Sequence, residues 1–257
     1  IFKNGLVLLY TKNKTAHNDA FHINVLTGSA LETKNEYGIN HLVEHLMFKA
    51  SKKRTTKEIS EQLECTGAVV NAWTNYDSVR FHFNCLPSKL AKCAEIYADM
   101  LFNKNISQEE FYKEKQVVCQ EIAMYQDLYA EMNSTNYFDY FWNMKDVAGT
   151  QKSVTKITLA QVNEFINKRY VPANMVISVY SKLSYRKIKH IVKEYFGNQE
   201  NPAEYINLRS EWKRIKAFEY KHINKKHVVK KDIAQVQVIH SFNLEKRSPA
   251  LLTFYRL

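Results

Sequence analysis

Glycine, proline and cysteine are scarce in this sequence, and long apolar runs are absent from it. With six Gly and four Pro in 257 residues, the chain is neither low in complexity nor collagen-like. No apolar run approaches the roughly 18 residues that a membrane span requires, so we expect no such span. The cysteines contain no Cys-x-x-Cys pair, which favours reduced thiols in the cytoplasm over a disulfide framework or a cysteine zinc site. They are Cys65, Cys85, Cys93 and Cys119.

Hydrophobic residues make up 45% of the chain and aromatic residues 13%, which is ample for a packed core in one large domain or two medium ones. The formal net charge of +11 invites a nucleic-acid interpretation. However, the densest basic runs, 49–57 and 221–231, are short and are not interleaved with aromatic side chains. We therefore predict a solvated basic surface and no nucleic-acid partner. Because the chain begins at Ile1 without an initiator Met or an apolar leader, we also expect a trimmed start.

Residue periodicity predicts an α+β fold with a mixed or antiparallel sheet covered by helices. Alternating β-branched and aromatic residues predict strands at 5–11, 21–27, 68–75, 78–86 and 176–180. The first two strands are expected to pair with each other through the Lys- and Asn-rich stretch 12–19. Helical patterns are expected at 39–48, 56–65, 88–103, 107–132, 158–170 and 184–196.

The chain is expected to divide near residue 200. Loop composition from Gly197 to Ser210, with Asn201-Pro202, indicates a boundary, so we expect a first domain at 1–200 and a linker at 201–215. Residues 216–257 regain a strand pattern and then a helical one. About 45 residues cannot easily bury a core of their own, so this tail is predicted to be the incomplete beginning of a second domain.

The motif His41-Leu42-Val43-Glu44-His45 lies in the first of these helices. Positions i and i+4 of a helix point the same way, so His41 and His45 can bind one metal ion while Glu44 faces the reacting water. This H-x-x-E-H order is the inverted zinc motif. The alternative interpretation is an amphipathic helix whose two histidines are ordinary core or surface groups.

A catalytic zinc ion needs three protein ligands and one open position, so a third donor must come from elsewhere. At 100° per residue, Glu114 and Glu121 fall on one face of helix 107–132. Val118, Tyr125, Leu128 and Met132 lie on the same face, whereas Lys113, Lys115, Gln116 and Gln120 point away. Burying an unpaired carboxylate is costly, which indicates that one of the two glutamates is a zinc ligand. The alternative is a rotated stripe, with both glutamates at its rim.

Together, the H-x-x-E-H motif and Glu114-x6-Glu121 resemble the insulinase/pitrilysin zinc peptidases, in particular the branch that contains mitochondrial processing peptidase. The resemblance implies Glu121 as the third ligand to one Zn²⁺ per chain, and Glu114 as a support of the catalytic site. It covers residues 1–200, including Ala148-Gly149-Thr150, Tyr170 to Val176 and Tyr195-Phe196-Gly197. Residues 232–242 look like the opening strand of the family's second homologous domain.

Asn71-Ala72-Trp73-Thr74 resembles the family's N-A-x-T strand, whose edge pairs with the substrate backbone. This resemblance implies that Asn71, Ala72, Trp73 and Thr74 bind substrate. Asp77 and Phe81 replace the usual Glu and Tyr of that strand. Lys49-Ala50-Ser51 also departs from the common F-x-G-T-type turn. These departures affect substrate positioning and leave the four metal-site residues intact.

The sequence thus predicts a zinc-dependent metalloendopeptidase that cleaves peptides or unfolded protein segments. Glu44 acts as the base toward the attacking water. The resemblance implies that an Arg and a Tyr holding the substrate come from a C-terminal half or from a homologous partner subunit, with a homodimer as one form of that arrangement. The alternative is a non-catalytic homologous partner subunit of a two-subunit processing peptidase.

Overall fold

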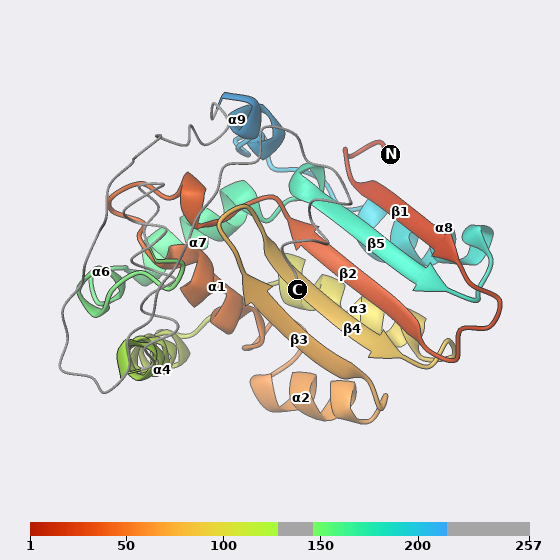
Figure 1. The fold of residues 1–257 in the computed structure, drawn as a ribbon, viewed down its shortest axis with the longest axis horizontal. Coiled ribbons are helices and arrows are strands. Elements are labelled where there is room, and N and C mark those ends of the chain that lie inside the picture. Colours follow the sequence, from red (N-terminus) through yellow and green to blue (C-terminus); the bar gives the residue numbers. More distant parts are fainter. Residues whose placement is uncertain (128–145, 215–257) are drawn as a thin grey trace, which may run out of the picture.

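The computed structural model describes residues 1–127 and 146–214, which fold around one five-stranded sheet (Figure 1). Its strands are β1 (Val7–Lys12), β2 (Asp19–Val25), β3 (Val69–Thr74), β4 (Val79–Cys85) and β5 (Met175–Ser181). Their order across the sheet is β1-β5-β2-β4-β3. Only the β1–β5 pair is parallel, so the sheet is mixed and β3 forms one of its edges.

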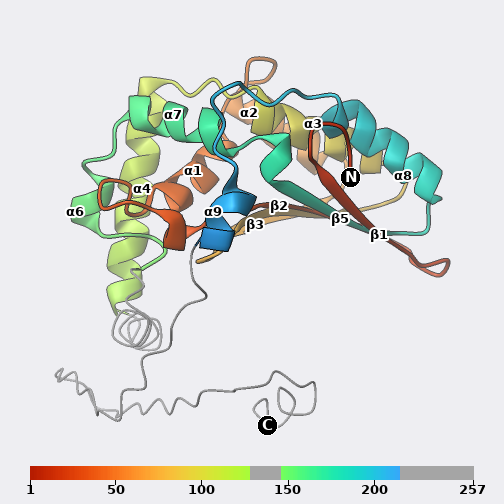
Figure 2. The same ribbon diagram turned by 90° about the horizontal axis from the view of Figure 1, so that it is seen from above.

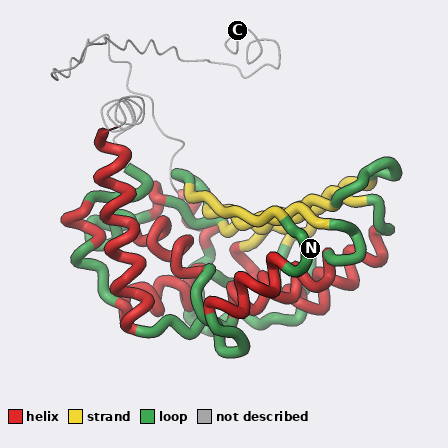
Figure 3. The backbone as a smooth tube through the Cα atoms, turned by 90° about the horizontal axis from the view of Figure 1, so that it is seen from below, coloured by secondary structure: helices red, strands yellow, loops and turns green. Residues whose placement is uncertain are grey.

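Within residues 1–127 and 146–214, the helices gather on one face of the sheet and leave the other face, here called the open face, uncovered (Figures 2 and 3). Strands β2, β4 and β5 alternate between buried and less buried residues, as expected for a sheet covered on one side only. Their buried aromatic side chains form the centre of the core, where the Phe21 and Phe83 rings stack with centroids 4.9 Å apart. The predicted α+β class is therefore confirmed.

The expected pairing of the first two strands is wrong. Strand β1 pairs with β5, and β2 lies between β5 and β4. Strand β5 reads Met-Val-Ile-Ser-Val-Tyr-Ser and buries every second residue, so it brings apolar side chains into the core between β1 and β2. Because β5 lies between β1 and β2, strands β1 and β5, about 170 residues apart in the sequence, form the parallel pair. Local sequence patterns cannot reveal this pairing.

The predicted helices are found close to their expected bounds. They are α1 (Ile39–Met47), α2 (Thr56–Glu64), α3 (Leu90–Phe102), α4 (Gln108–Asp127), α7 (Leu159–Arg169) and α8 (Tyr185–Val192). The expected end of α4, residues 128–132, lies outside the described residues. A short helix α6 (Gln151–Val154) and a π turn at Lys193–Gly197 were not expected. Among the helices of residues 1–127 and 146–214, none is long and apolar enough to cross a membrane.

The segment expected as a linker is folded onto the sheet domain up to Arg214. Helix α9 (Leu208–Arg214) lies inside the expected linker 201–215, and Leu208 is buried. Arg209 donates its Nε to the Ala173 carbonyl (2.9 Å), and the Asn201 side chain bonds Ala173 N and Asn4 O. The expected start of a second domain, 216–257, lies outside the described residues.

Helix α1, which carries the histidines, begins at a tightly constrained point. Gly38 has φ +87, and a Cβ there would lie 2.5 Å from the Ala148 carbonyl oxygen, so only glycine fits. The Glu32 carboxylate then acts as a distant cap, since it accepts the N–H groups of Gly38 and Asn40 at 2.9 Å each. It also accepts the Asn40 side-chain amide at 2.9 Å. A carboxylate at this helix end satisfies free N–H donors and interacts favourably with the helix dipole.

Removing the Glu32 cap should destabilise the fold in a pH-dependent way. Glu32→Ala leaves three enclosed donors without an acceptor, so we expect the free energy of unfolding to fall by about 1–3 kcal/mol at pH 5. Burial raises the pKa of the Glu32 carboxyl from 4.5 to about 7. The folded chain therefore holds this proton more tightly than the unfolded chain, and the stabilisation shrinks as the pH rises from about 4.5 to about 7.

Denaturant unfolding of both chains at pH 5 and pH 8 measures this effect, and the cost of Glu32→Ala should be smaller at pH 8. The matched control is Glu200→Ala, at an exposed position, which should change stability by less than about 0.5 kcal/mol at either pH. A cost that grows with pH would contradict this account of Glu32.

Candidate metal centre

Helices α1 and α4 pack together and place three predicted ligands in one cluster. His45 Nε2 lies 3.2 Å from Glu121 Oε2, and His41 Nε2 lies 3.7 Å from the same oxygen. One ligand atom from each of the three residues lies within 4.8 Å of the other two. Among the described residues these three form the one such group of His, Cys, Asp and Glu. The structure therefore brings together the three side chains that the sequence predicts as ligands.

The cluster fits a zinc ion in both donor chemistry and spacing. Two imidazole nitrogens and one carboxylate oxygen are a common ligand set of catalytic zinc. Bonds of about 2.0–2.1 Å in a tetrahedral site put ligand atoms roughly 3.3 Å apart, close to the separations of Glu121 from His45 and His41. His41 Nδ1 is buried and has no hydrogen-bond partner among the described residues, so no hydrogen bond to this nitrogen orients the ring.

A second group of side chains contacts the other ring nitrogen of His45, Nδ1. Glu114 Oε2 lies 3.5 Å from His45 Nδ1, and Glu114 Oε1 forms a 2.7 Å ion pair with Lys49 Nζ. The Glu114 side chain is only 11% exposed, and Lys49 provides the charge that compensates it. Lys49 had no predicted role. Lys49 follows the end of α1 at Met47, so helix periodicity gave no signal for this role.

The electrostatics of the metal-free site follow from this enclosure. Burial, together with the neighbouring His45, lowers the pKa of His41 to about 4, so its imidazole is neutral near pH 7. Burial alone would lower the pKa of His45, but its hydrogen bonds to Glu114 and Glu121 raise it to about 9. The hydrogen bond from His45 in turn lowers the pKa of Glu121 to about 2. Without metal, a protonated His45 therefore lies between two carboxylates.

Glu44 lies between the metal cluster and strand β3. The Thr74 hydroxyl donates to Glu44 Oε2 at 2.6 Å, which fixes the carboxylate at the end of β3. Burial raises the pKa of Glu44, partly offset by the hydrogen bond from Thr74. A carboxylate with a raised pKa, placed beside a metal-ligand cluster, is suited to accept and return a proton.

The four residues expected to bind substrate lie on edge strand β3. The Asn75 N–H donates to Ser78 O, so residues 69, 71 and 73 share hydrogen bonds with β4 in the alternating pattern of an antiparallel pair. The N–H and C=O groups of residues 70, 72 and 74 therefore point away from the sheet. In agreement, the Ala72 N–H donates to Asn71 Oδ1 (2.8 Å) instead of to β4. Beyond Thr74 the chain turns back into β4, so this outward row ends beside Glu44.

The face of α4 that turns inward differs in part from the predicted stripe. Glu114 and Val118 are buried and Glu121 is partly buried, as expected. Tyr125 was expected inside but is 37% exposed, because Ile122 takes the inward position next to Glu121. The prediction for Tyr125 is wrong on burial, although its hydroxyl bonds Glu121 and helps lower the pKa of that carboxyl. Leu128 and Met132 lie outside the described residues.

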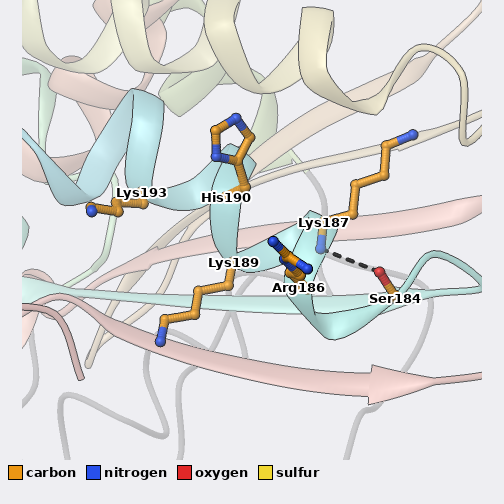
Figure 4. Close-up of a pocket in the computed structure, with 6 residues that line it drawn as sticks. All are labelled: Ser184, Arg186, Lys187, Lys189, His190 and Lys193. Atoms are coloured by element: carbon orange, nitrogen blue, oxygen red, sulfur yellow. Dashed lines mark hydrogen bonds between the residues drawn. The ribbon is translucent and has the colours of Figure 1, made fainter.

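A hollow on α8 is lined by several basic side chains, but they do not converge as the residues of a binding site would (Figure 4). The side chains of Arg186, Lys187, Lys189, His190 and Lys193 point apart from one another, and the hydrogen bond drawn there joins Lys187 N to Ser184 Oγ within the helix cap. Helix α8 packs against β1 and α3, whereas α1 packs against α4 and β3. These cations have the character of a solvated face.

Comparison with known proteins identifies the family of the chain. Residues 7–150 match the sequence profile of Insulinase (Peptidase family M16), and residues 156–253 match that of the Peptidase M16 inactive domain. An uncharacterized zinc protease of Rickettsia felis is 33% identical over 222 residues, which cover 81% of this chain and 53% of that protein. A protein of Schizosaccharomyces pombe named "Probable mitochondrial-processing peptidase subunit beta" is 26% identical over 80% of this chain and 46% of its own length.

A similar solved structure is the crystal structure of a protease from Helicobacter pylori. It superposes with a TM-score of 0.75 at 26% identity, over 80% of this chain and 51% of that one. The chain thus spans about half the length of these relatives. Since the first profile alone covers more than half of its residues, the chain belongs to the insulinase family, peptidase family M16.

Proposed function

We propose that this chain is the metal-bearing part of a zinc metalloendopeptidase that cleaves peptides or unfolded protein segments. The observation that carries the proposal is the convergence of His41, His45 and Glu121 next to Glu44, at the end of an edge strand. Names of relatives point the same way, since those from Rickettsia felis and Helicobacter pylori are called proteases.

In this proposal His41, His45 and Glu121 hold one Zn²⁺ per chain. When bound, the ion supplies Lewis acidity that polarises a carbonyl group and lowers the pKa of a water molecule to about 7. Two neutral imidazoles and a carboxylate suit this role, and His45 gives up its proton as it takes up the metal.

Glu44 is the proposed general base. Its carboxylate accepts a proton from the attacking water and returns it to the leaving amine of the cleaved peptide. Thr74 holds the carboxylate in position through the 2.6 Å hydrogen bond. Glu114, itself held by Lys49, orients His45 through Nδ1, as a supporting carboxylate does for a metal-binding histidine.

The substrate is proposed to add to the sheet as a strand beside β3. The outward N–H and C=O groups of Val70, Ala72 and Thr74 can bond an extended peptide without reading its side chains. Asn71 and Trp73 project their side chains to the open face, next to the added strand. The row of hydrogen bonds would bring a peptide carbonyl toward Glu44.

The proposal includes a larger assembly around the peptide. We propose that residues 1–200 form the zinc-bearing domain, that 201–215 connect it onward while packing on it as far as Arg214, and that 216–257 begin a second homologous domain. A C-terminal half or a homologous partner subunit would then enclose the peptide. A purely structural partner subunit is the weaker alternative, because the H-x-x-E-H motif and Glu121 are all present.

Zinc uptake should depend on all three proposed ligands. His41→Ala, His45→Ala and Glu121→Gln should each lose most of the bound zinc, because a three-ligand site fails when one donor is removed. Lys49→Met removes only the partner of Glu114 and should weaken zinc binding by about tenfold. Metal analysis of purified protein measures this, with the exposed His190→Ala as control. Stoichiometric zinc in all three ligand variants would refute the assignment.

Glu44→Gln should separate metal binding from catalysis. The amide keeps the shape of the side chain but cannot accept the proton, so zinc content should stay normal. Peptide hydrolysis should fall by on the order of 10² or more. The comparison is made on initial rates with a quenched fluorescent peptide, with Glu200→Gln as the surface control. Wild-type rates in Glu44→Gln would remove Glu44 from the mechanism.

Residues 1–257 alone should bind zinc yet hydrolyse peptides poorly. Binding energy from both walls of an enclosing chamber is needed to hold the carbonyl near the reacting groups. Adding the remainder of a longer chain, or a homologous partner, should raise kcat/KM at least about tenfold. Steady-state kinetics on the two preparations measure this difference. Equal kcat/KM values would mean that the site is self-sufficient.

A further inference from the structure

Five side chains form a cluster on the open face of the sheet, beside the edge strand. We call Trp73, Arg80, Asn24, His82 and His22 the open-face cluster. Trp73 lies directly opposite Arg80 in the β3–β4 pair, and Arg80 lies opposite Asn24 in the β2–β4 pair. His22 and His82 are also directly opposite each other, and their rings stack at 5.2 Å. The cluster therefore crosses three strands and reaches the sheet edge at Trp73.

Arg80 is the charged centre of this cluster and is held firmly. Its guanidinium carbon lies 4.5 Å from the centroid of the Trp73 ring, and its Nε donates to Asn24 Oδ1 at 2.6 Å. These contacts hold the planar group close to the indole of the edge strand. Within residues 1–127 and 146–214, the two terminal nitrogens of Arg80 have no hydrogen-bond or ion-pair partner. Four N–H donors are thus available to a ligand.

The surroundings give Arg80 no compensating negative charge. Trp73, Asn24 and the two histidines carry none, and the described residues include no carboxylate paired with Arg80. Burial, the neighbouring His82 and Arg80 lower the pKa of His22, and burial and Arg80 lower the pKa of His82. Both imidazoles are therefore neutral at pH 7, and the guanidinium is the one formal charge of the cluster.

The position of the cluster relates it to the proposed peptide strand. Side chains of residues directly opposite each other in a sheet lie on the same face. A peptide residue opposite Thr74 or Ala72 would point toward the helices and the metal cluster, as those two side chains do. A peptide residue opposite Trp73 would point to the open face and lie against the indole that carries Arg80.

We propose that the open-face cluster is a specificity subsite that selects an acidic side chain, aspartate or glutamate, in the bound peptide. The Trp73 ring supports the aliphatic part of that side chain, and the terminal nitrogens of Arg80 form a two-point bond with its carboxylate. Because strand side chains alternate, the preference applies to one position of the peptide and repeats, more weakly, two residues away. The inference rests on the proposed function and adds a substrate class to it.

The test compares peptides on the full chain loaded with zinc. Quenched fluorescent peptides differ only in placing Glu, Gln or Lys at one position, and the position is moved along the sequence. At one position we expect kcat/KM for Glu to exceed that for Lys by at least about tenfold. Arg80→Met should bring the three peptides within about twofold, Arg80→Glu should favour Lys, and Arg80→Lys should keep part of the preference for Glu. The exposed Arg186→Met on α8 serves as the matched control and should keep the wild-type ranking.

Direct binding separates this inference from the proposed function. Zinc-loaded Glu44→Gln, with and without Arg80→Met, is titrated with the same peptides in their labelled form by fluorescence anisotropy. A Glu-over-Lys preference in Kd that disappears with Arg80→Met supports the subsite even if no peptide is cleaved. Thermal unfolding checks that the Arg80 variants are folded, and Arg80→Lys remains informative if Arg80→Met is not. Equal affinities for the Glu and Lys peptides, an unchanged ranking in the Arg80 variants or an absence of binding would each overturn the proposal.

Discussion

The contact between His45 and the two carboxylates of α4 is the interaction on which the rest of the site depends. Glu114 and Glu121 lie about two turns apart on one helix, and both face α1. Two carboxylates held this close to a buried helix interface would repel each other and lose hydration without compensation. A protonated His45 between them, together with Lys49, provides that compensation when no metal is bound. The positive charges of His45 and Lys49 thus offset the two carboxylates at the interface between α1 and α4.

The same packing links the metal cluster to the sheet. Helix α1 contacts both α4 and β3, so its motif residues face different partners along one turn and a half. His41 and His45 face Glu121, whereas Glu44 reaches Thr74 at the end of the edge strand. The start of α1 is fixed by Gly38 against Ala148 and by the Glu32 carboxylate. The anchored start of α1 and the hydrogen bond between Thr74 and Glu44 together position the proposed ligands relative to the edge strand.

Sequence reasoning predicted those features that depend on local pattern. The helices α1 and α4 and the β3–β4 hairpin follow from periodicity and turn residues within short windows, and the three proposed ligands follow from helix geometry plus a family resemblance. The pairing of β1 with β2 failed because β5, about 150 residues later, takes the place between them. The predicted burial of Tyr125 was wrong because the helices packed against α4 determine which of its residues face inward. Ile122 takes that position. Lys49 and the open-face cluster were missed because their partners lie on other elements, where spacing along one chain segment gives no information. Glu32 was missed because it caps α1 from outside the helix, six and eight residues before Gly38 and Asn40.

Under the proposed function, strand β3 has to bind a peptide without pairing with other strands. An edge with free N–H and C=O groups is a site of unwanted pairing. Here Asn71 accepts the Ala72 N–H and so satisfies the central donor of the outward row. Arg80 adds a positive charge one strand inside the edge, on the open face, and a charge near an edge disfavours pairing with a second copy of the chain. A peptide must displace only one local side-chain hydrogen bond to pair with β3. If the peptide carries a carboxylate that binds Arg80, the same positive charge that repels another copy of the chain attracts the substrate. The charge of Arg80 would then both protect the edge strand and select the peptide.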